Sequence, residues 1–285
     1  MAFPTMLGAC MPSPRQPVPV LASSQSSVVA SATAPESCEP PPSVETITVD
    51  EPVPGEFHVV FELDGKDRWL AAAPPSAARS AYEAKVVDRL GHPADPRGLL
   101  ERQRQVYARS AAPGDVEVQT MDRALANVGR VGPVSCLDWM LWRAEDARFS
   151  MVEHPTELSA FVLRRGNRLR IYLSGADRLG QKLRSAVSDR VAADVALGWE
   201  LAAHLHNHPF LFDRRVGDRA FTTSRNVDDV GGALCPSTND LAAYESMSGR
   251  LGLGEAWITN GLSTARYGVA DRARLHAEPK PEPAP

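Results

Sequence analysis

The chain has few cysteines, no long apolar run and no large excess of either charge. Its four cysteines include no Cys-x-x-Cys pair, which excludes the common zinc-knuckle arrangement. No stretch is long and apolar enough to predict a transmembrane helix. The 31 basic residues are balanced by 35 acidic residues, so the cationic footprint of a phosphate-binding surface is missing and we expect no nucleic-acid partner.

The two ends of the chain differ in composition from the rest. Of the 24 prolines, 11 lie in the first 54 residues, and the last residues are also rich in proline. We therefore predict that residues 1–54 form an extended, flexible tether and that residues 271–285 form a disordered tail. The chain as a whole is 43% apolar, and its 285 residues can bury one medium core or two small ones.

The segment Met6-Leu7-Gly8-Ala9-Cys10 resembles a bacterial lipoprotein box, in which the cysteine is lipidated after the signal is cleaved. The residues before it include no Lys or Arg and are fewer than the apolar core of about 7 to 15 residues that such signals carry. Either the true start lies upstream, or the match is a chance one. The first alternative predicts a lipid anchor at Cys10 and a place in the cell envelope or periplasm, and the second leaves a cytoplasmic protein.

A His-x-His-Pro motif in the second half of the chain is the strongest indication of chemistry. It follows the apolar run 199–205, which predicts a buried strand, and in a strand residues two apart point to the same face. His206 and His208 can therefore converge on one ion. Pro209 ends the strand at this point, because proline cannot donate to a sheet ladder.

A Ser-x-x-Asp motif further along the chain supplies a third ligand type. Ser237 is placed to cap a helix, and Asp240 falls in the first turn of that helix. A carboxylate docked against the end of the histidine strand would complete a set of three ligands. This set leaves a fourth tetrahedral position for water, as in catalytic zinc sites.

Together these motifs resemble the signature of the JAMM or MPN+ metalloproteases (the JAB domain), over about half of the chain, from near Val134 to near Ala270. That signature is an upstream Glu, then His-x-His-Pro, then Ser-x-x-Asp. The resemblance implies one zinc ion per chain, held by His206, His208 and Asp240. It also implies that Ser237 stabilises the tetrahedral intermediate.

The upstream Glu of the signature has two candidates. Glu157 lies in His154-Pro155-Thr156-Glu157, directly before an apolar strand, and bacterial members of the family often show such a His-Pro-x-Glu. Glu153 is the alternative, but no strand follows it directly. We therefore expect Glu157 to be the general base that accepts a proton from zinc-bound water and passes it to the leaving amine.

The resemblance implies a zinc-dependent hydrolase of peptide or isopeptide bonds, with a protein or peptide substrate that is often ubiquitin-like. Two alternatives stay open. The chain can be a non-catalytic MPN-type scaffold or binding module, although such scaffolds typically lose their ligands. It can also be a zinc hydrolase of another amide, such as a cell-wall peptide, which the lipoprotein-like box would suit.

Two features depart from the family pattern. Residues 210–236 form an insertion between the two motifs, which we interpret as a substrate-facing lid or arm because long loops in compact domains are usually functional or disordered. Asn207 stands where eukaryotic members usually carry Ser or Thr. Because neighbouring residues in a strand point to opposite faces, we expect it to point away from the ligands. His204 points to the same strand face as His206 and His208, but it lies roughly 13 Å along the strand from His208, so we interpret it as a packing or outer-shell residue.

The cysteines leave the compartment open. Cys10 and Cys38 fall in the predicted tether. A Cys136–Cys235 disulfide would fix the helix that begins at Ser237 if the compartment is oxidising, but the sequence does not show which cysteines pair.

The expected fold is α/β (α+β), a mixed sheet flanked by helices like that of the MPN or JAB domain. Residues 120–270 would form the catalytic domain and residues 55–119 a small accessory unit without a catalytic constellation. In the accessory unit we expect a β-hairpin of residues 57–63 and 67–71 around Asp64-Gly65, then helices 76–90 and 96–109. In the catalytic domain we expect helices 135–146, 182–195 and one from 237 onward, and strands 158–163, 168–173, 199–206, 256–260 and 264–269.

Overall fold

The computed structural model describes residues 38–109, 111–180, 183–212 and 231–276. These residues all belong to one compact unit of the chain. The lipoprotein-like box at Cys10, residues 213–230 of the insertion and residues 277–285 of the tail lie outside the described residues. Within the described ranges, every helix is too short or too polar to cross a lipid bilayer.

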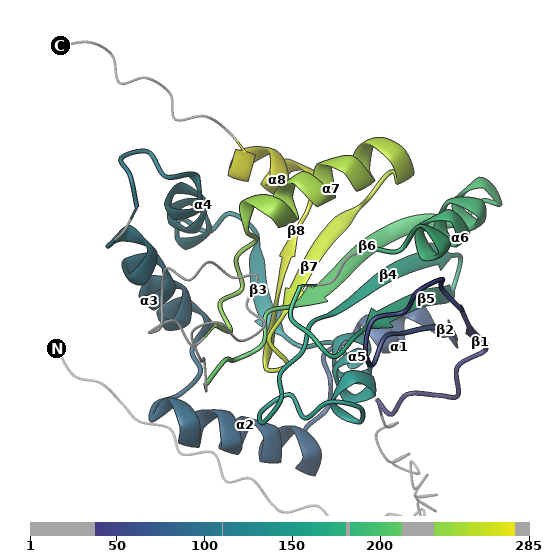
Figure 1. The fold of residues 1–285 in the computed structure, drawn as a ribbon, viewed down its shortest axis with the longest axis horizontal. Helices are drawn as coiled ribbons and strands as arrows, with labels where there is room; N and C mark the ends of the chain where they lie inside the picture. The colour runs from purple at the N-terminus through teal and green to yellow at the C-terminus, as the bar shows by residue number, and fades with distance from the viewer. Residues whose placement is uncertain (1–37, 110, 181–182, 213–230, 277–285) are drawn as a thin grey trace, which may run out of the picture. The chain divides into compact units, whose positions relative to one another are not determined.

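One sheet of eight strands organises the described residues (Figure 1). Its spatial order is β1-β2-β5-β4-β6-β7-β8-β3, and all neighbours are antiparallel except β6 and β7. The strands are β1 (Glu45–Thr46), β2 (Phe57–Asp64), β3 (Arg130–Pro133), β4 (Leu158–Arg165), β5 (Arg168–Gly175), β6 (Glu200–Asn207), β7 (Glu255–Thr259) and β8 (Ser263–Tyr267).

Helices cover both faces of the sheet (Figure 1). Apolar side chains of α1, α2, α3 and α5 join the core on one face, and those of α6, α7 and α8 join the core on the other. The mixed sheet between helices confirms the expected α/β class, and the narrower MPN or JAB fold stays a prediction. The helices are α1 (Lys66–Leu70), α2 (Ala77–Leu90), α3 (Pro96–Ala108), α4 (Val116–Leu125), α5 (Cys136–Asp146), α6 (Ser185–Ala196), α7 (Thr238–Leu251) and α8 (Val269–His276).

Local sequence signals predicted most of these elements to within a few residues. The side chains of Ser76, Ser135 and Ser237 each accept a backbone N–H bond at the start of a predicted helix. At Ser135 and Ser237 the third helical residue is an Asp that bonds back, which completes a capping box. The strands β4, β5, β6, β7 and β8 also lie where alternation and apolar runs predicted them.

The predicted hairpin in residues 57–71 is wrong. The first half is a strand, β2, but it pairs along its whole length with β5 rather than with residues 67–71. Residues 67–71 lie mostly in α1. In this helix Trp69 is buried in the core and donates its indole N–H to Asp64 O at 3.1 Å. Residues 55–119 are therefore no separate accessory unit, since their strand belongs to the common sheet.

The predicted limits of the tether and tail are also wrong. Residues 38–54 are packed rather than flexible: β1 pairs with β2, and Cys38 is buried. At the other end, residues 271–276 belong to α8, where Leu275 is fully buried and Arg272 donates to three carbonyl oxygens.

The disulfide joins Cys38 to Cys136, at a sequence separation of 98. The sequence left open whether Cys136 pairs with Cys235, and the structure decides against it, because the two cysteines lie in different clusters. Cys136 packs in the large core beside Cys38, whereas Cys235 is a buried free thiol beside Leu100 and Met121.

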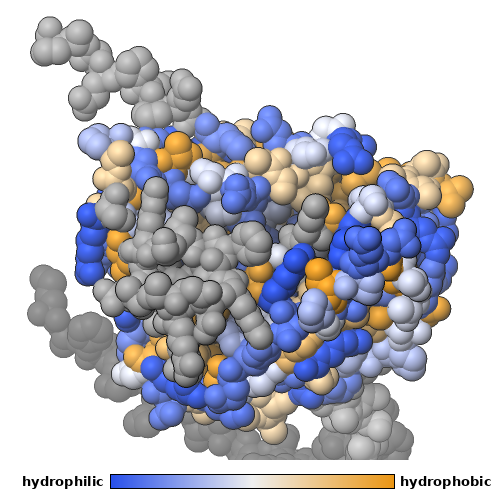
Figure 2. Space-filling model, viewed as in Figure 1, coloured by the Kyte–Doolittle hydropathy of each residue, from blue (hydrophilic) through white to orange (hydrophobic). Residues whose placement is uncertain are grey.

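Large apolar side chains that remain exposed are dispersed over the described surface. They are Val44, Val116, Val131, Leu183, Leu197 and Val269. On the face shown in Figure 2, apolar residues outside the grey atoms are interspersed with polar ones. Single exposed apolar side chains are ordinary on soluble proteins, so they give no argument for a partner.

Glu145 makes stability depend on pH, because it is fully buried on α5. Burial raises its pKa from 4.5 to about 7, against a hydrogen bond from Thr156 and the charge of Arg148. A carboxyl group with a higher pKa in the folded state stabilises the fold when protonated. Its contribution is complete below about pH 4.5, is lost as pH rises to about 7, and amounts to roughly 3 kcal/mol.

We therefore expect Glu145→Gln to gain stability relative to the wild type as pH rises from 5 to about 7.5. Urea unfolding of both proteins across this range measures the difference. Because other groups also titrate, the difference between the two proteins is the readout. If the free energies of unfolding of the two proteins change in parallel with pH, Glu145 does not titrate between pH 5 and about 7.5.

Candidate metal centre

His206 and His208 lie where β6 ends, with Pro209 directly after them. Their Nε2 atoms are 3.1 Å apart. Asp240, in the first turn of α7, places its two carboxylate oxygens 3.5 Å from Nε2 of His206 and 3.6 Å from Nε2 of His208. The predicted convergence of the three side chains is therefore present.

These distances are short enough for the three side chains to share one metal ion. Each residue offers one ligand atom, and these atoms all lie within 4.8 Å of one another. Among the described residues, His206, His208 and Asp240 are the His, Cys, Asp and Glu side chains whose ligand atoms cluster in this way. The group can hold a metal ion. Two imidazoles and one carboxylate occur as ligands in catalytic zinc sites and also in non-haem iron sites.

The outer ring nitrogens of both histidines have partners that leave Nε2 available. Nδ1 of His208 lies 2.8 Å from Ala233 O, which can only accept, so the hydrogen of the neutral ring is on Nδ1. Nδ1 of His206 lies 3.0 Å from the hydroxyl of Tyr244 on α7, which can accept in the same way. Outer partners of this kind fix the tautomer and orientation of metal-binding histidines.

Tyr244→Phe should therefore weaken zinc binding by about 10- to 100-fold while leaving the fold intact, because it removes only the hydroxyl. Competition with a chelator of known affinity measures the change. Tyr172→Phe is the matched control, since its hydroxyl bonds to Asp194 on the same face of the sheet but away from the histidines. Equal zinc affinity in Tyr244→Phe and the wild type would show that the hydroxyl does not orient His206.

The ligands shift one another's charge states. Burial opposes ionisation of Asp240, but His206 and His208 outweigh it and hold the pKa of Asp240 well below its usual value. Burial also lowers the pKa of His208, yet Asp240 outweighs it and leaves that pKa raised. A bound cation would replace the proton that these groups share, because metal binding and protonation compete for the same lone pairs.

Of the two candidate bases, Glu157 is the one beside the histidines. Ser159, two residues after Glu157, pairs with His206 across β4 and β6, which places Glu157 near the end of the histidine strand. Burial raises the pKa of Glu157, and the charges of His208 and His206 oppose that rise. Glu157 also accepts the Gly180 N–H at 2.6 Å. Glu153, in contrast, is exposed and paired with Arg89 at 2.7 Å.

Ser237 is tied to the ligand Asp240. Its hydroxyl donates to Oδ2 of Asp240 at 2.8 Å and accepts the Asp240 N–H at 3.2 Å, and its own N–H donates to the same carboxylate. The capping box therefore also holds the metal-binding carboxylate in place.

His204 packs rather than binds. It is buried against Phe161 and Tyr244, and neither ring nitrogen has a hydrogen-bond partner. Burial lowers its pKa to about 3, so the ring is neutral. This placement agrees with the expected packing role and keeps His204 out of the ligand set.

Two residues that support the site were missed by the sequence analysis. Asn207, fully buried, accepts the Leu158 N–H at 2.6 Å and donates to Thr156 O at 2.9 Å, so it holds the backbone on both sides of Glu157. Glu117 on α4 accepts both the N–H and the hydroxyl of Thr238 and so anchors the first turn of α7. The unusual Asn between two histidines was a visible signal, whereas nothing local marked Glu117.

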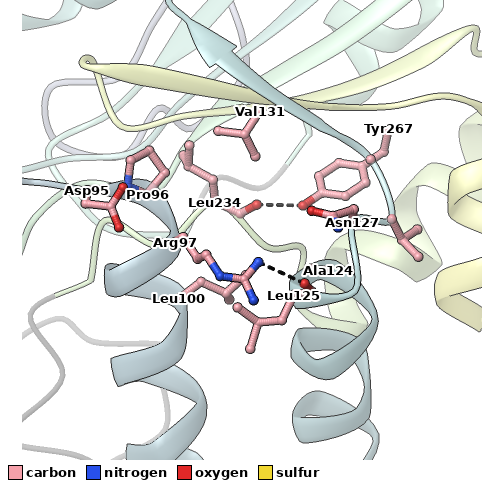
Figure 3. A pocket seen from close by; sticks show the side chains of 12 residues that line it. Asp95, Pro96, Arg97, Leu100, Ala124, Leu125, Asn127, Val131, Leu234 and Tyr267 are labelled. Carbon is pink, nitrogen blue, oxygen red and sulfur yellow. Dashed lines mark hydrogen bonds between the residues drawn. The ribbon is translucent and has the colours of Figure 1, made fainter.

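A cavity of about 370 Å³ lies between α3, α4 and β3 (Figure 3). Its wall includes Leu100, Leu125, Val131 and Leu234, and the Tyr267 hydroxyl donates to Leu234 O at its edge. It shares no residue with the metal-binding group.

Comparison of the chain with protein-family models, with curated proteins and with solved structures found no match.

Proposed function

We propose that the chain is a zinc-dependent hydrolase of peptide or isopeptide bonds, of the JAMM or MPN+ type. The observation that supports the proposal is the convergence of ligand atoms from His206, His208 and Asp240, all within 4.8 Å of one another, near the half-buried carboxylate of Glu157. Such a site has a ligand set with room for water and a base next to it. These are the two parts that metal-assisted hydrolysis requires.

The residues of the site have separate roles in the proposed reaction. A zinc ion held by His206, His208 and Asp240 would supply a Lewis acid and lower the pKa of bound water to about 7. Glu157 accepts the proton of the attacking water at its carboxylate and returns it to the leaving amine; its raised pKa brings the group closer to the pH at which it must both take and give a proton. The Ser237 hydroxyl donates to Asp240 before the reaction and would turn its one hydrogen to the developing oxyanion, while the Ser237 N–H continues to hold the carboxylate.

The disulfide favours a second candidate substrate within the same chemistry. Buried disulfides such as Cys38–Cys136 are typical of oxidising compartments and rare in the cytosol. An amide of the cell envelope, such as a cell-wall peptide, is therefore a candidate substrate beside ubiquitin-like conjugates. The same reasoning favours the envelope or periplasm over the cytoplasm.

Hydrolysis by zinc-loaded wild type, Glu157→Gln and Glu153→Gln tests the proposal on ubiquitin-like isopeptides and on cell-wall peptides. Glu157→Gln should keep its zinc and lose about 10²- to 10⁴-fold in rate, because the general base is removed. Glu153→Gln is the matched control and should cleave like the wild type. Zinc binding without cleavage of either substrate class would favour the scaffold alternative, and an active Glu157→Gln would refute the base assignment.

A further inference from the structure

Glu157 is held by a turn that follows β5. Its backbone N–H donates to Arg178 O at 3.2 Å, and its carboxylate Oε2 accepts the Gly180 N–H at 2.6 Å. The second bond acts directly on the oxygen atoms that would carry a proton. The orientation of the carboxylate therefore depends on where the turn 177–180 lies.

This turn is in contact with a second turn, Val53–Glu56, from the N-terminal part of the described chain. The Asp177 N–H donates to Pro54 O at 3.1 Å. Gly55 has φ +67°, and a Cβ added there would lie 2.9 Å from Cβ of Asp177 and 3.2 Å from its nitrogen. The two backbones are thus packed at a distance that only glycine permits.

Glu56 closes the turn 53–56 and anchors it. Its N–H donates to Val53 O at 3.0 Å, and its carboxylate accepts the Val53 N–H at 2.8 Å. The carboxylate also receives two bonds of 2.6 Å from Arg184, the residue that caps α6. The Arg184 guanidinium holds the pKa of Glu56 at about 2, so the pair stays charged at neutral pH.

We propose that Glu56, paired with Arg184, is a positioning residue for Glu157. The pair fixes the turn 53–56, this turn holds the turn 177–180, and Gly180 orients the carboxylate. The inference rests on the proposed role of Glu157 in hydrolysis. The metal ligands lie on β6 and α7, outside this series of contacts, so zinc binding should not depend on it.

Hydrogen exchange of the Gly180 amide in the zinc-free, full-length protein tests the positioning without any substrate. Arg184→Met and Gly55→Ala should each speed this exchange by at least about 10-fold, because both release the turn 177–180. Arg184→Lys keeps the charge and should restore most of the protection. Arg190→Met is the matched control: Arg190 is also on α6, but its ion pair is with Glu45 of β1 rather than with Glu56 of the turn 53–56.

The protection of β6 amides, such as that of Leu205, shows whether each variant is folded. If Glu157→Ala, which removes the acceptor, speeds exchange at Gly180 but Arg184→Met and Gly55→Ala do not, the inference is overturned. It is also overturned if Glu157→Ala has no effect, since the carboxylate then does not protect the Gly180 amide.

Activity gives the second readout. On a substrate that the wild type cleaves, Arg184→Met should lower kcat by about 10-fold or more with KM and zinc content unchanged, as expected for a misplaced base. An unchanged kcat despite faster Gly180 exchange would overturn the link to catalysis. If the wild type cleaves nothing while the exchange results hold, the proposed function fails and the structural coupling stands.

Discussion

If the wild type binds about one zinc ion per chain, as we propose, His208→Ala and Asp240→Ala should each lose it. Each variant removes one of the three side chains whose ligand atoms lie within 4.8 Å of one another. The loss of affinity should therefore exceed the 10- to 100-fold that is typical of changes outside the ligand set. Metal analysis of purified protein and competition with a chelator measure both quantities.

Two further variants sharpen this experiment. His92→Ala removes an exposed histidine whose Nδ1 bonds only within its own turn, so it should keep its zinc. Glu157→Gln should also keep it, because the base is not a ligand. Zinc that survives Asp240→Ala but disappears in His204→Ala would refute the ligand set.

Zinc should also stabilise the fold, because two ligands lie on β6 and the third on α7. At a free zinc concentration 100 times the dissociation constant, the added free energy of unfolding is about 2.7 kcal/mol. His208→Ala should show no such dependence on zinc.

Cys38→Ser should lower the free energy of unfolding by roughly 4 to 5 kcal/mol. The disulfide closes a loop with a sequence separation of 98 residues, and a loop of that size restricts the unfolded chain by about that amount. Marginally stable domains have only about 5 to 15 kcal/mol in total, so the change should be easy to detect. Urea unfolding with and without a reductant measures it.

Cys235→Ser provides the control for this experiment. Cys235 is a free thiol in a small cluster, so its loss should cost about 1 to 2 kcal/mol and should leave the response to reductant unchanged. The observed pairing would be contradicted if the stability of the wild type does not change with the reductant, or if a peptide map shows a bond between Cys136 and Cys235.

The candidate site was largely predictable because its residues lie in short motifs with strong local rules. Strand parity alone places His206 and His208 on one face, and the capping box alone places Asp240 in the first turn of a helix. Only the contact between β6 and α7 had to be supplied by the fold. The same alternation predicted that His204 would point to the same strand face as His206 and His208, at a distance too great for it to join the ligands.

The choice between Glu157 and Glu153 was less secure, because the two carboxylates are only four positions apart. The fold separates them: Asn207 holds the backbone around Glu157 beside the histidines, whereas Glu153 pairs with Arg89 at the surface. Neither contact has a local signature, since Asn207 and Arg89 are distant in sequence from the residues that they hold.

By itself, then, the sequence determined the α/β class, the ligand types and their spacing, since periodicity, capping and strand parity act over a few residues. The tertiary structure decided the partner of β2, the Cys38–Cys136 disulfide and the packing of residues 38–54 against the sheet. These features depend on contacts between residues tens of positions apart. Strand order and burial select the partners in such contacts, and the local composition of each segment does not predict them. A proline-rich segment that resembles a tether thus includes, in the turn 53–56, the contact that holds the candidate base.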